Sequence, residues 1–86
     1  MNIETALKKQ IFVDWVVAEK PTRKDKYILS VNGVLFSLTK LKIRIETFDL
    51  IFFDRHGEIV ATINFADIET IKARKGIVDR EYTRIF

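Results

Sequence analysis

The sequence predicts an α+β domain, in which a small antiparallel β-meander of four to five strands packs against an N-terminal amphipathic helix. Three observations lead to this prediction. Apolar residues near the start have helical spacing, an Asn-Gly pair separates two apolar segments, and apolar and polar residues alternate in the segments that follow. The 86 residues suffice for one core, so we expect a single domain over residues 1–86.

The first predicted element is a helix over residues 3–18. Apolar residues recur there at steps of four, a spacing that places side chains on one helix face: Ile3, Leu7, Ile11 and Trp15. The alternative is a helix that ends near Gln10 and a strand over residues 11–17, where β-branched valines gather. We favour the helix and expect Leu7, Ile11 and Trp15 to face the core.

Residues 27–38 have the pattern of a β-hairpin with a two-residue turn. Asn32 and Gly33 tolerate the positive φ angles that a type I′ turn requires at both central positions. Such a turn also sets the register of the two strands. It places six side chains on one face, which we expect to be the core face, as the pairs Val31–Val34, Leu29–Phe36 and Tyr27–Leu38.

Alternating patterns predict further strands over residues 41–47, 50–53 and 59–65. The alternation breaks between Thr47 and Asp49, which predicts a turn or a bulge there. Residues 67–76 fit either a short helix ending at Gly76 or a turn followed by a strand, and the tail fits a C-terminal helix or a strand. The predicted core is Leu7, Ile11, Trp15, Leu29, Val31, Val34, Phe36, Ile43, Ile45, Phe52, Ile59, Ile63 and Phe65.

The residue types present favour a binding protein over an enzyme. The chain has no cysteine and one histidine, His56, so we expect no thiolate site, no cofactor and no catalytic residue. Asp54, His56 and Glu58 alternate as metal ligands do, but we expect them to form a solvated turn and predict no metal site. The first residues lack the basic start and apolar stretch of a secretory signal, so we expect a cytoplasmic protein.

Two groups of residues are candidates for contact with a partner or an anion. Four cations lie in a polar connector, namely Lys20, Arg23, Lys24 and Lys26, and a strand face combines Lys42, Arg44 and Phe48. The net charge of +3 is small, and the two signs mix along the chain. We therefore expect an interaction module that binds a protein partner and also self-associates, because a small sheet leaves an edge unpaired. The alternative is binding to nucleic acid or an anionic membrane through the basic 20–26 loop.

Residues 50–71 combine a strand that ends in Phe52 and Phe53, a short turn with Asp54 and Gly57, and an isoleucine-rich return strand. This segment resembles the middle of small bacterial pleckstrin-homology-like and GRAM-like domains. The resemblance covers about a quarter of the chain. It implies a binding scaffold for proteins or lipid head groups and no enzymatic activity, and it assigns no site residue.

Overall fold

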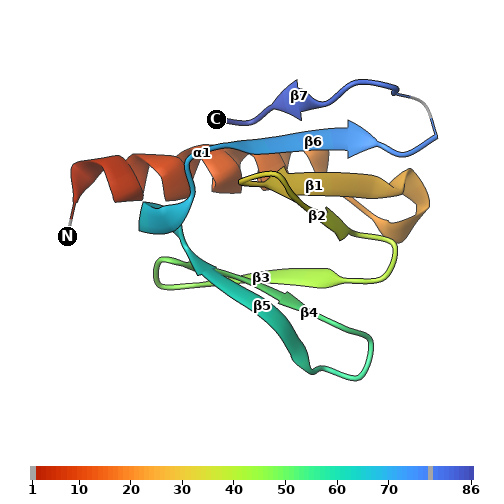
Figure 1. Cartoon of the computed structure of the whole chain (residues 1–86), viewed down its shortest axis with the longest axis horizontal. Helices are drawn as coiled ribbons and strands as arrows, with labels where there is room; N and C mark the ends of the chain where they lie inside the picture. Colours follow the sequence, from red (N-terminus) through yellow and green to blue (C-terminus); the bar gives the residue numbers. More distant parts are fainter. Residues whose placement is uncertain (1, 78) are drawn as a thin grey trace.

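The computed structural model describes residues 2–77 and 79–86. These residues form one α-helix, seven β-strands and two short 3-10 helices (Figure 1). In chain order the elements are α1 (Ile3–Glu19), η1 (Arg23–Asp25), β1 (Tyr27–Val31), β2 (Val34–Ser37), β3 (Lys42–Glu46), β4 (Asp49–Phe53), β5 (Ile59–Asn64), η2 (Phe65–Asp67), β6 (Ile71–Lys75) and β7 (Thr83–Arg84).

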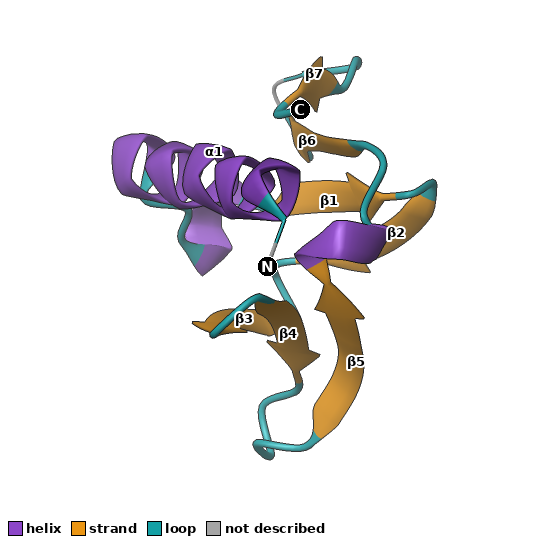
Figure 2. Cartoon of the chain, turned by 90° about the vertical axis from the view of Figure 1, so that its left-hand side faces the viewer, coloured by secondary structure: helices purple, strands orange, loops and turns teal. Residues whose placement is uncertain are grey.

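The strands form two antiparallel sheets, which confirms the predicted α+β class. One sheet has the strand order β2-β1-β6-β7 and the other the order β3-β4-β5. The three-stranded sheet lies below the four-stranded sheet in both views, and α1 runs beside β1 (Figures 1 and 2). The arrangement differs from a single meander of four to five strands, because β6 returns to pair with β1.

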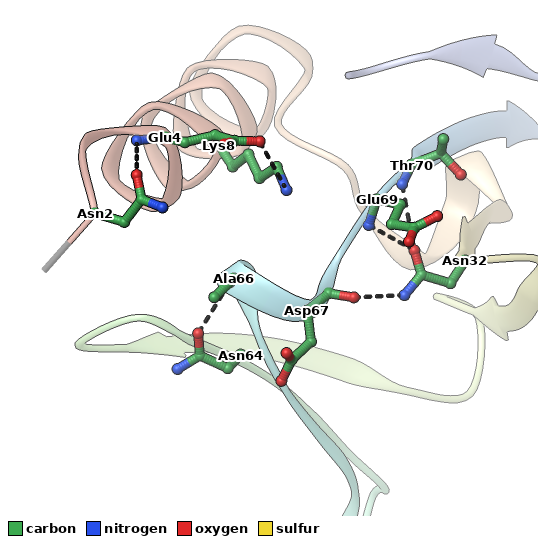
Figure 3. A network of polar contacts seen from close by, with 9 residues as sticks. All are labelled: Asn2, Glu4, Lys8, Asn32, Asn64, Ala66, Asp67, Glu69 and Thr70. Atoms are coloured by element: carbon green, nitrogen blue, oxygen red, sulfur yellow. Dashed lines mark hydrogen bonds and ion pairs between the residues drawn. The ribbon is translucent and has the colours of Figure 1, made fainter.

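Helix α1 is confirmed, and the alternative strand over residues 11–17 is wrong. The side chain of Asn2 caps the helix by accepting a 2.8 Å hydrogen bond from the amide of Glu4 (Figure 3). Glu4 also lies 3.7 Å from Lys8 in an ion pair one turn further along. At the other end Lys20 adopts a left-handed conformation, and its amide donates to the carbonyl of Val16, which ends the helix.

The predicted core face of α1 is wrong for two of its three residues. Leu7 and Ile11 are 57% and 42% exposed, whereas Phe12 is fully buried and Trp15 packs against the core. A step of four residues turns by about 40° more than one full helical turn, so a series at that spacing drifts around the helix. Thr5 and Phe12 are seven residues apart, a spacing that nearly returns to the same face, and both are buried.

The β1–β2 hairpin has the predicted turn and register. Asn32 and Gly33 both have positive φ angles, 50° and 83°, and Leu29 lies opposite Phe36. Val31 is buried, but its partner Val34 is largely exposed. The prediction that Val34 belongs to the core is therefore wrong. Strand β2 is one of the two outer strands of its sheet, so a residue at its start has no neighbouring strand on one side.

Asn32 also fixes the path of the chain into β6 (Figure 3). Its side-chain amide donates to the carbonyl of Asp67 at 2.8 Å, and its side-chain oxygen accepts from the amides of Glu69 and Thr70. The turn η2 therefore leads directly into strand β6. Of the two interpretations of residues 67–76, the turn followed by a strand is correct, and the short helix is wrong.

The tail forms a short strand rather than a C-terminal helix in the part that the structure describes. Strand β7 pairs with β6 through Thr83 opposite Ala73 and Arg84 opposite Lys72. The amide of Ile85 continues this attachment by donating to the carbonyl of Ile71. Val78, to which the predicted patterns of the tail also extend, lies outside the described residues.

The second sheet confirms the predicted break after Thr47. Thr47 has a positive φ of 51°, and Glu46 pairs with Asp49 across a two-residue turn. Strand β4 is buried at its three central positions, as its apolar sequence predicts. Ile59 is exposed, so its predicted core position is wrong. The register of β4 and β5 shifts between Phe52 and Phe53, and Ile59 lies beyond this irregularity.

The core joins both sheets to the helix. Its buried residues are Phe12, Tyr27, Leu29, Val31, Phe36, Leu38, Leu50, Phe52, Phe65, Ile68, Ile71 and Ala73. Ile43, Ile45 and Ile63 are partly buried against this cluster. Within the described residues, no helix is both long and apolar enough to cross a membrane.

Candidate functional site

One cavity with cationic lining residues lies where three connections meet. These are the α1–β1 connection, the β2–β3 connection and the β4–β5 loop, which Figure 1 shows at the same end of the molecule. The cavity has a volume of about 300 Å³. Its lining residues are Pro21, Thr22, Arg23, Leu38, Lys40, Leu41, Lys42, Ile43 and Arg55. We refer to it as the basic pocket.

The lining of the basic pocket separates into apolar and cationic residues. Four apolar side chains are buried or half-buried, namely Pro21, Leu38, Leu41 and Ile43. The four cationic residues are all exposed: Arg23, Lys40, Lys42 and Arg55. No acidic residue is among the described residues that line the pocket. The pocket therefore presents an apolar interior with a positively charged rim.

Hydrogen bonds order the first wall of the basic pocket. The amide and hydroxyl of Thr22 both donate to the carboxylate of Asp25, at 2.9 and 3.1 Å, and close the turn η1. These bonds hold the pKa of Asp25 below its usual value, because they stabilise the ionised carboxylate. The carbonyl of Lys26 accepts a hydrogen bond from the amide of Gly76, which ties the connector to the end of β6.

The structure brings two of the predicted contact residues together, Arg23 and Lys42. Lys20, Lys24 and Lys26 are exposed but are not among the lining residues. Lys40 and Arg55 complete the cationic rim and were not predicted. Lys40 lies in the β2–β3 connection and Arg55 in the β4–β5 loop, both far from Arg23 in sequence, so no local pattern could have linked them to Arg23.

Arg44 and Phe48 lie apart from the basic pocket. Arg44 pairs with Glu46 at 3.0 Å, and its guanidinium lies 5.5 Å from the ring centre of Phe53. Phe48 is half-buried, with the Lys9 ammonium 4.9 Å from its ring centre. A second cavity, of about 320 Å³, includes Phe48 in its lining, with Asn2, Thr5, Asn64 and Ala66. The three residues of the predicted strand face, Lys42, Arg44 and Phe48, therefore lie in three different environments.

The loop that contains His56 is a hydrogen-bonded turn. The carboxylate of Asp54 accepts from the amides of His56 and Glu58, at 2.9 and 3.0 Å, so it satisfies backbone donors. Across residues 2–77 and 79–86, no group of three or more histidine, cysteine, aspartate or glutamate side chains is placed to hold a metal ion.

Exposed apolar side chains at the edges of the two sheets are a second set of candidate contact residues. Strand β5 is an outer strand of its sheet and begins with Ile59 and Val60, which are 61% and 54% exposed (Figure 2). Strand β2, at the edge of the other sheet, begins with the exposed residues Val34 and Leu35. Helix α1 adds a further group of exposed apolar residues: Ile3, Leu7, Ile11 and Val17.

Comparison of the chain with protein-family models, with curated protein sequences and with solved structures finds no match. The resemblance of residues 50–71 to pleckstrin-homology-like and GRAM-like domains therefore stays a prediction.

Proposed function

We propose that this chain is a non-enzymatic interaction module that binds a protein partner by adding a strand to β5, and that a second copy of the chain is one such partner. The observation that supports the proposal is the composition of the β5 edge. None of the six residues of Ile59–Asn64 is charged, and none is proline. Edge strands of monomeric proteins usually contain charges or proline, which discourage pairing with another chain.

The side chains of β5 also favour strand addition. Neighbouring residues of a strand point to opposite faces, so Ile59 and Val60 expose apolar surface on both sides of the edge. An added strand would satisfy the outer backbone groups of β5 and cover both side chains. This combination of backbone hydrogen bonds and apolar contacts is typical of peptide recognition at sheet edges.

The alternative, binding of nucleic acid or an anionic membrane through residues 20–26, has less support. Only Arg23 of the four cations in this segment lines the basic pocket. Lys20 has a structural position at the end of α1, and Lys26 has one at the end of η1. These positions do not favour a continuous basic surface across residues 20–26.

The experiment measures the mass of the chain in solution over a wide range of concentrations by light scattering. We expect a mass above the 10.1 kDa of one chain at high concentration. The double variant Ile59→Lys/Val60→Lys should stay at the single-chain mass, because charge on both faces opposes strand addition. The matched control Ile3→Lys/Val17→Lys removes exposed apolar residues from α1 and should self-associate like the natural chain.

A constant single-chain mass for the natural chain would overturn the proposal of self-association. Binding to other proteins is then tested by affinity capture with the same three proteins. A captured protein supports the proposal only if the β5 variant loses it and the α1 control retains it. Capture that is equal for all three proteins would overturn the role of β5.

A further inference from the structure

We propose that the basic pocket binds a small organic phosphate, in which a phosphate monoester is joined to a compact apolar or planar group. The pocket is lined by the α1–β1, β2–β3 and β4–β5 connections and by the start of β3. It does not include β5, so the proposal is independent of strand addition at that edge. It rests on the charge, the apolar interior, the size and the ordering of the pocket.

The charge of the rim determines which ligands the pocket favours. Arg23, Lys40, Lys42 and Arg55 contribute four positive charges, and the described lining residues contribute no negative charge to offset them. Within the described part of the chain, none of the four forms an ion pair. A phosphate monoester has up to two negative charges and three acceptor oxygens, which suit several cations at once. The arginines add planar, bidentate donors that match a phosphate.

The apolar interior explains why free phosphate is not the best ligand. Leu38 is buried, and Pro21, Leu41 and Ile43 are half-buried, whereas the four cations are exposed. A hydrated inorganic ion would leave this apolar surface exposed to water. A ligand whose apolar or planar group covers these side chains gains from their burial. The volume of about 300 Å³ lies at the lower end of the range for small-molecule pockets, which limits the ligand to a compact group.

All three walls of the pocket are ordered by hydrogen bonds. The α1–β1 connection is closed by Thr22 and Asp25. In the β2–β3 connection, the amide of Leu41 donates to the carbonyl of Ser37 at 3.0 Å. In the β4–β5 loop, the amide of Asp54 donates to the carbonyl of Glu58 at 2.9 Å. Ordered connections reduce the entropy that is lost on binding, so the backbone of the pocket is organised before its ligand arrives.

The experiment is a titration of the full chain with a small phosphate monoester. Calorimetry measures the Kd, and the movement of amide signals in NMR spectra locates the binding site. Phenyl phosphate is the probe, because it joins a phosphate monoester to a planar apolar ring. Inorganic phosphate and phenol each represent one half of it. We expect phenyl phosphate to bind more tightly than either half, with affinity that falls as salt concentration rises. The largest changes in amide signals should map to residues 22–23, 38–43 and 55.

Variants separate the two parts of the pocket. The double variant Arg23→Gln/Arg55→Gln should raise the Kd for phenyl phosphate about tenfold. The control Lys72→Gln/Arg84→Gln removes the same charge from β6 and β7, away from the pocket, and should leave the Kd unchanged. The variant Leu41→Ser should reduce the preference for phenyl phosphate over inorganic phosphate. NMR spectra of each variant verify that the chain remains folded.

Two further ligands distinguish the sources of the phosphate monoester. Adenosine monophosphate represents a nucleotide, and vesicles that contain phosphatidic acid represent a lipid head group. Binding of either one, weakened by the arginine variant and not by the control, supports the proposal and identifies the source. The proposal is overturned if phenyl phosphate, adenosine monophosphate and the vesicles all fail to bind. It is also overturned if the control weakens binding as much as the arginine variant does, because net charge alone would then explain the affinity.

Discussion

The rings of Phe36 and Phe52 stack in parallel, with their centres 4.0 Å apart and their planes 5° from each other. Phe36 belongs to β2 of the four-stranded sheet, and Phe52 belongs to β4 of the three-stranded sheet. The two side chains are nearly or fully buried, at 8% and 0% exposure. This pair therefore connects the two sheets within the core.

Truncation of this pair should destabilise the whole chain. We expect Phe52→Ala to lower the free energy of unfolding by about 3–5 kcal/mol, because it removes a fully buried ring and leaves a cavity. The coupling between Phe36→Ala and Phe52→Ala in a double-mutant cycle should be about 0.5–1.5 kcal/mol. Urea denaturation measures both values. The control is Val34→Ala, which truncates an exposed side chain. The prediction would be contradicted if Phe52→Ala lowered the free energy of unfolding by no more than this control does.

The Asn32 side chain should stabilise the chain through its hydrogen bonds, in addition to the preference of asparagine for a positive φ in the turn. Asn32→Gly keeps the positive φ and removes the hydrogen bonds to residues 67–70, so we expect a loss of about 1 kcal/mol. Asn32→Ala should lose roughly 1 kcal/mol more, because alanine is strained in the left-handed region. Thermal or urea denaturation compares the two variants. Equal stability of Asn32→Gly and the natural chain would show that the side-chain contacts contribute nothing.

Replacement of Gly76 by a residue with a side chain should destabilise the chain, because there is no space for a Cβ atom at this position. A Cβ at this position would lie 2.6 Å from the carbonyl oxygen of Lys26, which is a backbone atom with little freedom to move. Gly76→Ala should therefore cost about 1–3 kcal/mol and disturb the junction of β6 with the connector. Gly57→Ala is the matched control, since Gly57 has a positive φ of 79° but open space around its Cβ. We expect its cost to be about 1 kcal/mol, from backbone strain alone.

The Tyr27 hydroxyl should make stability depend on pH in the alkaline range. Burial of the ring, followed by the 3.0 Å hydrogen bond to Glu19, raises the pKa of Tyr27 from 10.0 to about 12. Above pH 10 the unfolded chain loses this proton more readily than the folded chain does. The stabilisation is therefore complete below pH 10 and is lost as pH rises toward 12.

The measurement compares the natural chain with Tyr27→Phe by urea denaturation at a series of pH values from about 9 to about 12. We expect the stability of the natural chain to fall more steeply than that of the variant. The comparison removes the contribution of all other groups, because these are the same in both proteins. Parallel curves for the two proteins would contradict the assigned pKa.

Local sequence patterns predicted most of the elements. Helix α1 followed from apolar spacing, and the β1–β2 hairpin followed from Asn32 and Gly33, whose turn also set the register. The break after Thr47 was visible because an uninterrupted strand would place the charged Asp49 on its apolar face. In each case the decisive interactions lie within a few residues of one another, where propensity and turn chemistry act directly.

The pairing between distant segments could not be predicted in the same way. Strand β6 pairs with β1 across about forty residues, and Asn32 helps to hold this pairing through the segment before β6. The face of α1 that meets the core also depends on contacts with distant residues. Phe12 lies against Phe65, with ring centres 5.9 Å apart, and this contact turns Leu7 and Ile11 toward solvent.

The candidate site shows the same division. Arg23 and Lys42 were recognisable as exposed cations, since local charge excess and strand alternation are properties of short segments. Their union with Lys40 and Arg55 around an apolar interior required three connections to converge. That convergence is set by how the two sheets pack.

The amino-acid order by itself determined where the helix and most strands form, because backbone preferences and turn geometry depend on neighbouring residues. Only the tertiary structure decided that the strands divide into two sheets, which face of α1 is buried, and which cations surround the basic pocket. Those properties arise from burial shared among segments that lie far apart along the chain, and no single segment contains them.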